Sequence, residues 1–266
     1  FDPSKSLVFF TRNGIVKRTN LSEFKNIRSV GVRAISLDEN DELVTALIAQ
    51  TYDDMPVTDP ENELSVETEV LEVEELQNEI DEDSANTEED ANSGDETMLF
   101  VVTKKGMCLK FKISKVRQMG RTARGVTGIK FKEPGDEVVG AAVIESNDQE
   151  ILSISQKGIG KRTTADEYRL TNRGGKGVIC MKLTSRTGDL VGVVMVDEEQ
   201  DLMALTSSGK MIRVDMQSIR KAGRNTSGVI VVNVDGDDVV SIARCPKADD
   251  GEDEDEAPSE DMGLLE

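Results

Sequence analysis

ILSISQKGIGKRTTADEY, residues 151–168, is one of four stretches of this chain that align with one another without a gap. Each stretch has two strand-like runs joined by a turn that ends in glycine, which is the pattern of a β-hairpin. Self-similarity at a regular spacing is typical of repeat architectures and decides the fold. The other copies are LVFFTRNGIVKRTNLSEF (7–24), LFVVTKKGMCLKFKISKV (99–116) and LMALTSSGKMIRVDMQSI (202–219).

Two further apolar runs follow each hairpin. One run begins after a second glycine, as in VICMKL (178–183) after Gly177, and the other closes the unit, as in DEVVGAAVI (136–144). A unit of about 45 residues with four short strands has the size of a propeller blade. The sequence therefore predicts an all-β, propeller-like protein with four visible four-stranded blades, at residues 1–50, 99–146, 147–197 and 198–246.

The net charge of −20 is unevenly distributed. Residues 51–98 hold 19 acidic and no basic residues, and residues 247–266 hold 10 acidic residues and Lys247. Subtracting these from the totals of 52 acidic and 32 basic residues leaves 23 and 31, a body of +8. We predict a basic module with an acidic, mostly disordered insertion and an acidic, disordered tail. Both segments could compete with an anionic ligand for the basic surface, or act only as solubilising loops.

The composition excludes several classes of function. With 0 histidines, Ser-His-Asp and Cys-His catalysis and most zinc sites are absent. With 0 tryptophans and 3% aromatic residues, base-stacking platforms are not expected. No apolar run approaches a membrane span and no leader opens the chain, so we expect a cytoplasmic protein. The start FDPSKSLVFF lacks an initiator methionine and indicates a fragment of a longer protein. We expect Cys108, Cys180 and Cys245 to be buried free thiols.

Cations recur in register in the repeats. Four residues beyond the turn glycine lie Arg18, Lys110, Arg162 and Arg213, and eleven beyond it lie Lys25, Arg117, Arg169 and Arg220. Fifteen beyond it lie Arg121, Arg173 and Arg224, with Arg28 nearby in the first unit. These residues are the candidate DNA-binding cations, together with their neighbours Lys17, Arg124, Lys161 and Lys176. The alternative is a solvated blade face with local ion pairs.

The loop TNRGGKGV (171–178) concentrates glycines and cations. It is not a P-loop, because Lys176 is followed by glycine and the earlier glycine position holds Leu170. Gly174, Gly175 and Gly177 could lay their backbone against a nucleic-acid phosphate or form a plain turn. Cations without aromatics or a recognition helix contact phosphates and do not read bases. A basic track around the rim of the blades, bending duplex DNA, is the interpretation that we favour.

The blades resemble the C-terminal domain of the DNA gyrase A subunit, a β-pinwheel around whose edge DNA is wrapped. The resemblance covers residues 7–245 and is carried by VRQMGRTARGVTGIKF (116–131), GIGKRTTADEY (158–168), RGGKGVI (173–179) and AGRNTSGVIVV (222–232). TNRGGKG also matches the family signature Q-R-R-G-G-[RK]-G in five of seven positions, with Thr171 and Asn172 departing. That signature belongs to the first blade of the family, so we expect this chain to hold the last four of about six blades.

The resemblance implies a function and partners. It implies duplex DNA wrapping as part of a holoenzyme of two A and two B subunits that introduces negative supercoils with ATP and Mg. In that family the catalytic tyrosine lies in the N-terminal part of the same polypeptide. Tyr52 and Tyr168 are expected to be packing or surface residues, so this part carries no catalytic residue, metal or cofactor. The alternatives are the corresponding domain of topoisomerase IV and a propeller-like scaffold for protein interactions.

Overall fold

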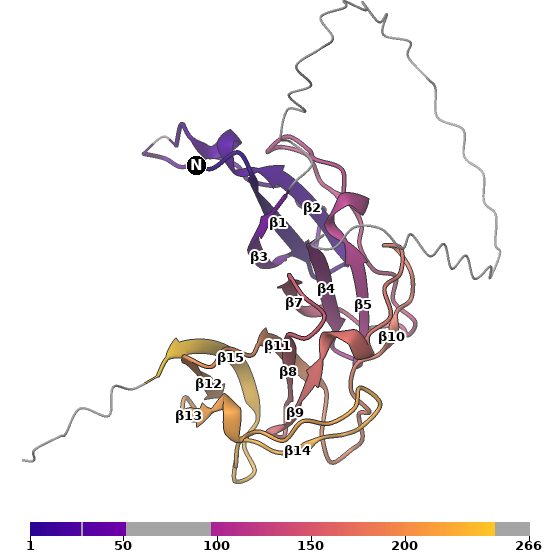
Figure 1. Cartoon of the computed structure of the whole chain (residues 1–266), viewed down its shortest axis with the longest axis vertical. Helices are drawn as coiled ribbons and strands as arrows, with labels where there is room; N and C mark the ends of the chain where they lie inside the picture. Colours follow the sequence, from indigo (N-terminus) through magenta and orange to yellow (C-terminus); the bar gives the residue numbers. More distant parts are fainter. Residues whose placement is uncertain (28, 52–96, 248–266) are drawn as a thin grey trace, which may run out of the picture.

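The computed structural model describes residues 1–27, 29–51 and 97–247 of the chain. Four sheets follow one another around an arc (Figure 1). The described part is built from strands and short 3-10 helices, which confirms the all-β, propeller-like prediction. Most of the predicted acidic insertion and nearly all of the acidic tail lie outside the described residues.

Each repeat begins with an antiparallel hairpin around its turn glycine. In the second blade, which packs between two neighbours, the first strand is apolar on both faces, and all six residues of β4 are buried. The hairpins are β1 (Lys5–Thr11) with β2 (Ile15–Asn20), β4 (Met98–Thr103) with β5 (Met107–Lys112), β8 (Glu150–Ser155) with β9 (Ile159–Thr164), and β12 (Gln200–Thr206) with β13 (Met211–Asp215).

A 3-10 helix ends each hairpin: η1 (Leu21–Phe24), η2 (Ile113–Lys115), η3 (Ala165–Glu167) and η4 (Met216–Ser218). Asn20 starts η1 with a side chain that accepts a hydrogen bond from the Ser22 N–H at 2.8 Å. Asp215 does the same for the Gln217 N–H at 2.9 Å before η4. Such side-chain caps satisfy the first free N–H groups of a helical turn.

The closing strand of each repeat pairs with the first strand of its own hairpin. These strands are β3 (Leu43–Gln50), β7 (Val138–Ile144), β11 (Leu190–Met195) and β15 (Val239–Pro246). β3 contacts β7, β7 contacts β11, and β11 contacts β15. The closing strands therefore form the inner side of the arc, next to one another.

The outermost strand of a blade comes from the following repeat. β6 (Val126–Thr127) pairs with β2, β10 (Val178–Ile179) with β5, and β14 (Val229–Ile230) with β9. The sheet orders are β3-β1-β2-β6, β10-β5-β4-β7 and β11-β8-β9-β14, while β13-β12-β15 has three strands in the described part of the chain. A four-stranded blade thus contains three strands of its own repeat and one strand of the next repeat. This exchange ties each repeat to the one before it.

Apolar side chains fill the spaces between neighbouring sheets in three clusters. Cys108 and Cys180 are buried in the second cluster as free thiols, whereas Cys245 is only half-buried. Tyr168 is also buried there, with its ring centroid 4.7 Å from that of Phe100. Burial raises the pKa of Tyr168, so its phenol stays protonated. Tyr168 is therefore a core residue, and Tyr52 lies outside the described residues.

Candidate nucleic-acid interface

A loop leads from each of η2, η3 and η4 to the outermost strand of the preceding blade. These loops are residues 117–125, 169–177 and 220–228, and we call them, with the outer strands that they precede, the outer rim. Successive loops are hydrogen-bonded to neighbouring repeats: the Gly174 N–H donates to Gly128 O at 2.6 Å, and the Lys182 N–H donates to Thr226 O at 3.1 Å. The Ser36 N–H likewise donates to Ala123 O at 3.2 Å. The outer rim is therefore continuous from repeat to repeat.

Four exposed cations follow the 3-10 helices: Lys25, Arg117, Arg169 and Arg220. Lys25 comes directly after η1, and each arginine lies two residues beyond its helix. In the described part of the chain, none of these four side chains forms an ion pair or a hydrogen bond to another residue. Lys176 in the second rim loop is exposed in the same way. These positive charges are available to an anionic partner.

The loop arginines Arg121, Arg173 and Arg224 are half-buried. Arg173 donates from Nε to Lys115 O at 2.8 Å and from a terminal nitrogen to Thr127 O at 3.1 Å. Arg224 donates to Ile179 O at 3.2 Å. A guanidinium has five N–H donors, so these bonds leave donors over for a phosphate. Arg124 is exposed and lies 2.8 Å from Asp38, while Arg28 lies outside the described residues.

The cations four residues beyond the turn glycine have a different place. Arg18, Lys110 and Arg162 are 4%, 4% and 7% exposed. Lys110 Nζ donates to Ala165 O at 2.6 Å, and Arg162 Nε donates to Ile219 O at 2.6 Å. Both therefore hold the 3-10 helix region of the following repeat. This corrects the expectation that the column lies on a phosphate-binding surface, because its spacing reflects a structural clamp.

Arg213 occupies the same position in the fourth repeat but is exposed. In the described chain no later repeat packs against it. Its Nε donates to Asp201 at 2.7 Å, and a terminal nitrogen donates to Pro246 O of its own repeat. Lys17 and Lys161, one residue before the clamp position, are 0% exposed. Residue type and spacing do not report burial. The sequence analysis therefore grouped five buried cations with the exposed ones: Lys17, Arg18, Lys110, Lys161 and Arg162.

The glycines of TNRGGKGV have a structural explanation. Gly177 has φ +74°, and a Cβ there would lie 2.3 Å from Cys108 O, so only glycine fits where this loop crosses β5. Gly174 also has a positive φ, of +78°, and Gly175 lies beside Leu109. The loop is docked against the second repeat, since the Thr171 N–H donates to Lys110 O at 2.9 Å. Gly177 lets the loop pack closely against β5 and Gly174 provides a positive φ, whereas a Cβ at Gly175 would make only an ordinary contact of 3.5 Å with Leu109.

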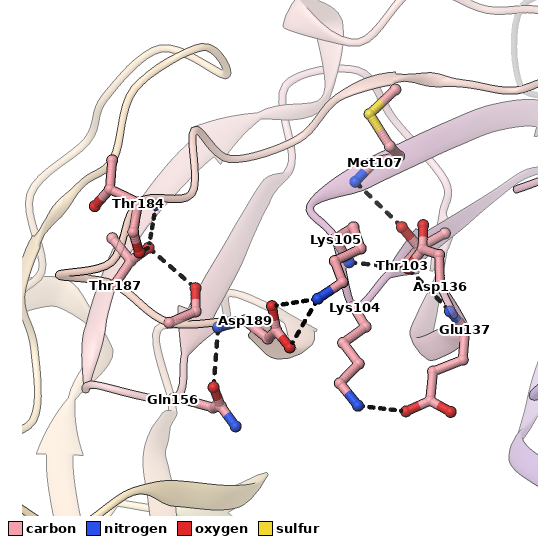
Figure 2. A network of polar contacts seen from close by, with 11 residues as sticks. Thr103, Lys104, Lys105, Met107, Asp136, Glu137, Gln156, Thr184, Thr187 and Asp189 are labelled. Atoms are coloured by element: carbon pink, nitrogen blue, oxygen red, sulfur yellow. Dashed lines mark hydrogen bonds and ion pairs between the residues drawn. The ribbon is translucent and has the colours of Figure 1, made fainter. Parts of the chain in front are cut away.

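A second group of cations is neutralised by acids near the hairpin turns, and the sequence analysis did not single them out. Lys104 lies 3.0 Å from Glu137 in its own blade, and Lys105 lies 3.0 Å from Asp189 in the next one (Figure 2). Lys157 pairs with Asp238 in the same interblade manner as Lys105. The sequence does contain this pattern. Each of these lysines lies one or two residues before a turn glycine, and each acid lies directly before a closing strand. The Lys105 and Lys157 pairs join blades, and all three pairs leave little free charge.

The described residues contain no group of three or more His, Cys, Asp or Glu side chains that could hold a metal ion. In the same part of the chain no helix is long and apolar enough to cross a membrane. The features that stand out are therefore the outer rim and its cations without acidic partners.

Comparison with known proteins is consistent with this arrangement. The family model "DNA gyrase C-terminal domain, beta-propeller" matches residues 5–50, 97–145, 149–197 and 200–246, which are the four repeats. The chain belongs to this family of propeller-like domains. It is 68% identical over 270 residues to the DNA gyrase A subunit of Campylobacter fetus, a match that covers 98% of this chain and 30% of that protein. The chain thus spans less than a third of the length of that relative.

Solved structures share the fold at low sequence identity. The C-terminal domain of a DNA topoisomerase IV superimposes with a TM-score of 0.69 at 22% identity, covering 92% of this chain and 63% of that one. A DNA gyrase A C-terminal domain gives a TM-score of 0.66 at 22% identity, covering 91% and 66%. These two likenesses support the fold alone.

Proposed function

We propose that this chain binds and wraps duplex DNA along its outer rim, as the C-terminal part of a DNA gyrase A subunit. The observation that carries the proposal is the row of exposed cations Lys25, Arg117, Arg169 and Arg220, one in each repeat. The three arginines lie on the hydrogen-bonded outer rim. Such a row matches the spaced phosphates of a duplex and contains no group that would read bases. The identity of the relatives favours gyrase over topoisomerase IV.

The proposed role in the whole enzyme follows from the relatives. We infer a cytoplasmic holoenzyme of two A and two B subunits that uses ATP and Mg to introduce negative supercoils. This chain would supply the wrapping surface and no catalytic group, because its one described tyrosine is a buried core residue. An interaction scaffold without a DNA role is the competing function. The free cations of the outer rim argue against it, since a scaffold has no need of unpaired charge in every repeat.

The test is the salt dependence of duplex DNA binding by the 266-residue chain. If about eight phosphates are neutralised, raising salt from about 50 to about 200 mM weakens binding by about 10⁴-fold. Replacing Arg117, Arg169 and Arg220 by Gln is expected to lower the slope of log Kd against log salt by about three.

The matched control replaces Lys104, Lys105 and Lys157 by Gln. It removes the same number of charges from residues that are already paired with acids. We expect its salt slope to equal that of the unmodified chain. Equal slopes for both triple variants would disprove the outer rim as the contact surface, and a flat salt dependence of the unmodified chain would disprove phosphate binding altogether.

A further inference from the structure

Two lysines are buried with their charge directed at the main chain. Lys17 and Lys161 each lie three residues beyond a turn glycine, in the first and third repeats, and each is 0% exposed. Neither ammonium forms an ion pair with a carboxylate of the described residues. A buried ammonium is costly unless it is well hydrogen-bonded, so its partners indicate why it is there.

Both lysines bond to the same place in the following repeat. Lys161 Nζ donates to Gly223 O at 2.6 Å and to Arg224 O at 2.5 Å. Lys17 Nζ donates to Arg121 O at 2.5 Å and to Ala34 O at 2.5 Å. Arg121 and Arg224 occupy equivalent positions, fifteen residues beyond their turn glycines. Each lysine thus fixes the main chain of a rim loop at its arginine.

The second repeat provides an internal comparison. Leu109 stands at the lysine position there, beside Gly175 of the next loop. That loop is held instead by its own arginine, since Arg173 donates to Lys115 O and Thr127 O. In contrast, the Arg121 guanidinium donates no hydrogen bond within the described part of the chain, and the Lys17 ammonium holds its main chain instead. The buried ammonium therefore holds two of the three rim loops. The 220–228 loop has both ties, since Arg224 also donates to Ile179 O at 3.2 Å.

We propose that Lys17 and Lys161 are positioning residues for DNA binding, because their ammonium groups hold the rim loops in the conformation that presents Arg121 and Arg224. The inference rests on the proposed function, which makes the outer rim the contact surface. A loop released from its lysine would have to be ordered again on binding, at a cost in affinity.

The role of the charge on Lys17 and Lys161 can be tested by measuring DNA binding at different pH values. Burial lowers the pKa of Lys17 and of Lys161 to about 8. The charged residue in contact with Lys17 is Arg121, and Lys161 is faced by Cys180, Cys108, Glu167 and Arg224. No thiol faces Lys17 among the groups that set its pKa, so Lys17 isolates the lysine effect.

The experiment measures Kd for duplex DNA at fixed salt for the full chain, for Lys17→Met and for Lys161→Met. Lys157→Met is the matched control, since it also removes one lysine charge but from an exposed interblade ion pair. We expect about tenfold weaker binding for each buried-lysine variant and little change for the control. The unmodified chain should also lose about tenfold in affinity between about pH 7 and about pH 9.5, and Lys17→Met should lose less.

The pH series keeps the inference testable if a methionine variant fails to fold, because it needs only the unmodified chain. The unfolding free energy should move in the opposite direction. A lysine with a lowered folded pKa holds fewer protons than the unfolded chain above about pH 8, so stability rises with pH while DNA affinity falls. Binding that is independent of pH, or buried-lysine variants that bind like Lys157→Met, would overturn the inference. If the unmodified chain bound no duplex DNA even at low salt, the proposed function itself would be refuted.

Discussion

At the scale of single residues, the same residue type has different roles when it is buried and when it is exposed. Arg162 and Arg213 stand at the same position of two repeats, yet one is 7% exposed and clamps the next repeat while the other is exposed. Arg162 donates to Ile219 O and Gln217 O and lies 3.3 Å from Glu150. A guanidinium that satisfies buried carbonyls contributes to the fold and has few donors left for DNA.

Replacing Arg162 by Met is therefore expected to lower the free energy of unfolding by about 2–3 kcal/mol, because buried carbonyl groups lose their donor. Arg117→Met serves as the control and should cost less than about 0.5 kcal/mol, because the Arg117 side chain is exposed and makes no hydrogen bond or ion pair in the described part of the chain. Urea denaturation of both variants measures the difference. Equal losses would show that the position has no clamping role.

At the scale of elements, the turn glycines mark places where neighbouring repeats touch. Gly158 has φ +71°, and a Cβ there would lie 2.1 Å from Val232 O in the next repeat. Gly209 is the same turn glycine one repeat later, with φ +85°, and a Cβ there would meet nothing within 4 Å of the described chain. The hairpin alone explains the positive φ, while the close approach is added by the segment that follows β14 in the next repeat.

Substituting these two glycines separates the cost of a positive φ from the cost of the close contact with the next repeat. Gly209→Ala should cost about 1–2 kcal/mol of unfolding free energy, which is the penalty of positive φ for alanine. Gly158→Ala should cost more than about 4 kcal/mol, because the segment around Val232 must also move. Thermal or urea unfolding provides the measurement. Similar costs at the two positions would mean that the interrepeat contact is unimportant.

At the scale of the whole molecule, the arc of blades turns a row of cations into a curved track. The outer strands and loops follow that arc from repeat to repeat (Figure 1). Bending 20–30 base pairs of DNA costs on the order of 1–6 kcal/mol, so the duplex follows such a curve only if each repeat adds phosphate contacts. Wrapping is thus a property of several blades together.

Ligating nicked circular DNA in the presence of saturating chain should therefore shift the linking number. The variant with Gln at 117, 169 and 220 should reduce the shift, whereas the variant with Gln at 104, 105 and 157 should leave it intact. Topoisomer distributions on agarose gels provide the readout. An unchanged linking number together with tight binding would mean that these blades bind DNA without wrapping it.

The sequence by itself determined the local features of this protein. The hairpins, the turn glycines and the four-fold repetition could be predicted, because alternating apolar residues and positive-φ turns are set by neighbours along the chain. The registers of the cations were also visible. The sequence analysis placed the cations four, eleven and fifteen residues beyond the turn glycine all on the surface. The local sequence does not contain the information for that step.

The tertiary structure decided which cations face outward and which repeat completes each blade. Lys17, Arg18 and Arg117 are all basic residues at fixed distances from a glycine, but only Arg117 is exposed. What buries the other two is a loop supplied by the next repeat, about 100 residues away in the case of the Lys17–Arg121 contact. Arg121 O of that loop accepts a hydrogen bond from the Lys17 ammonium. This distant partner, which no local pattern reports, separates a cation of the fold from a cation of the outer rim.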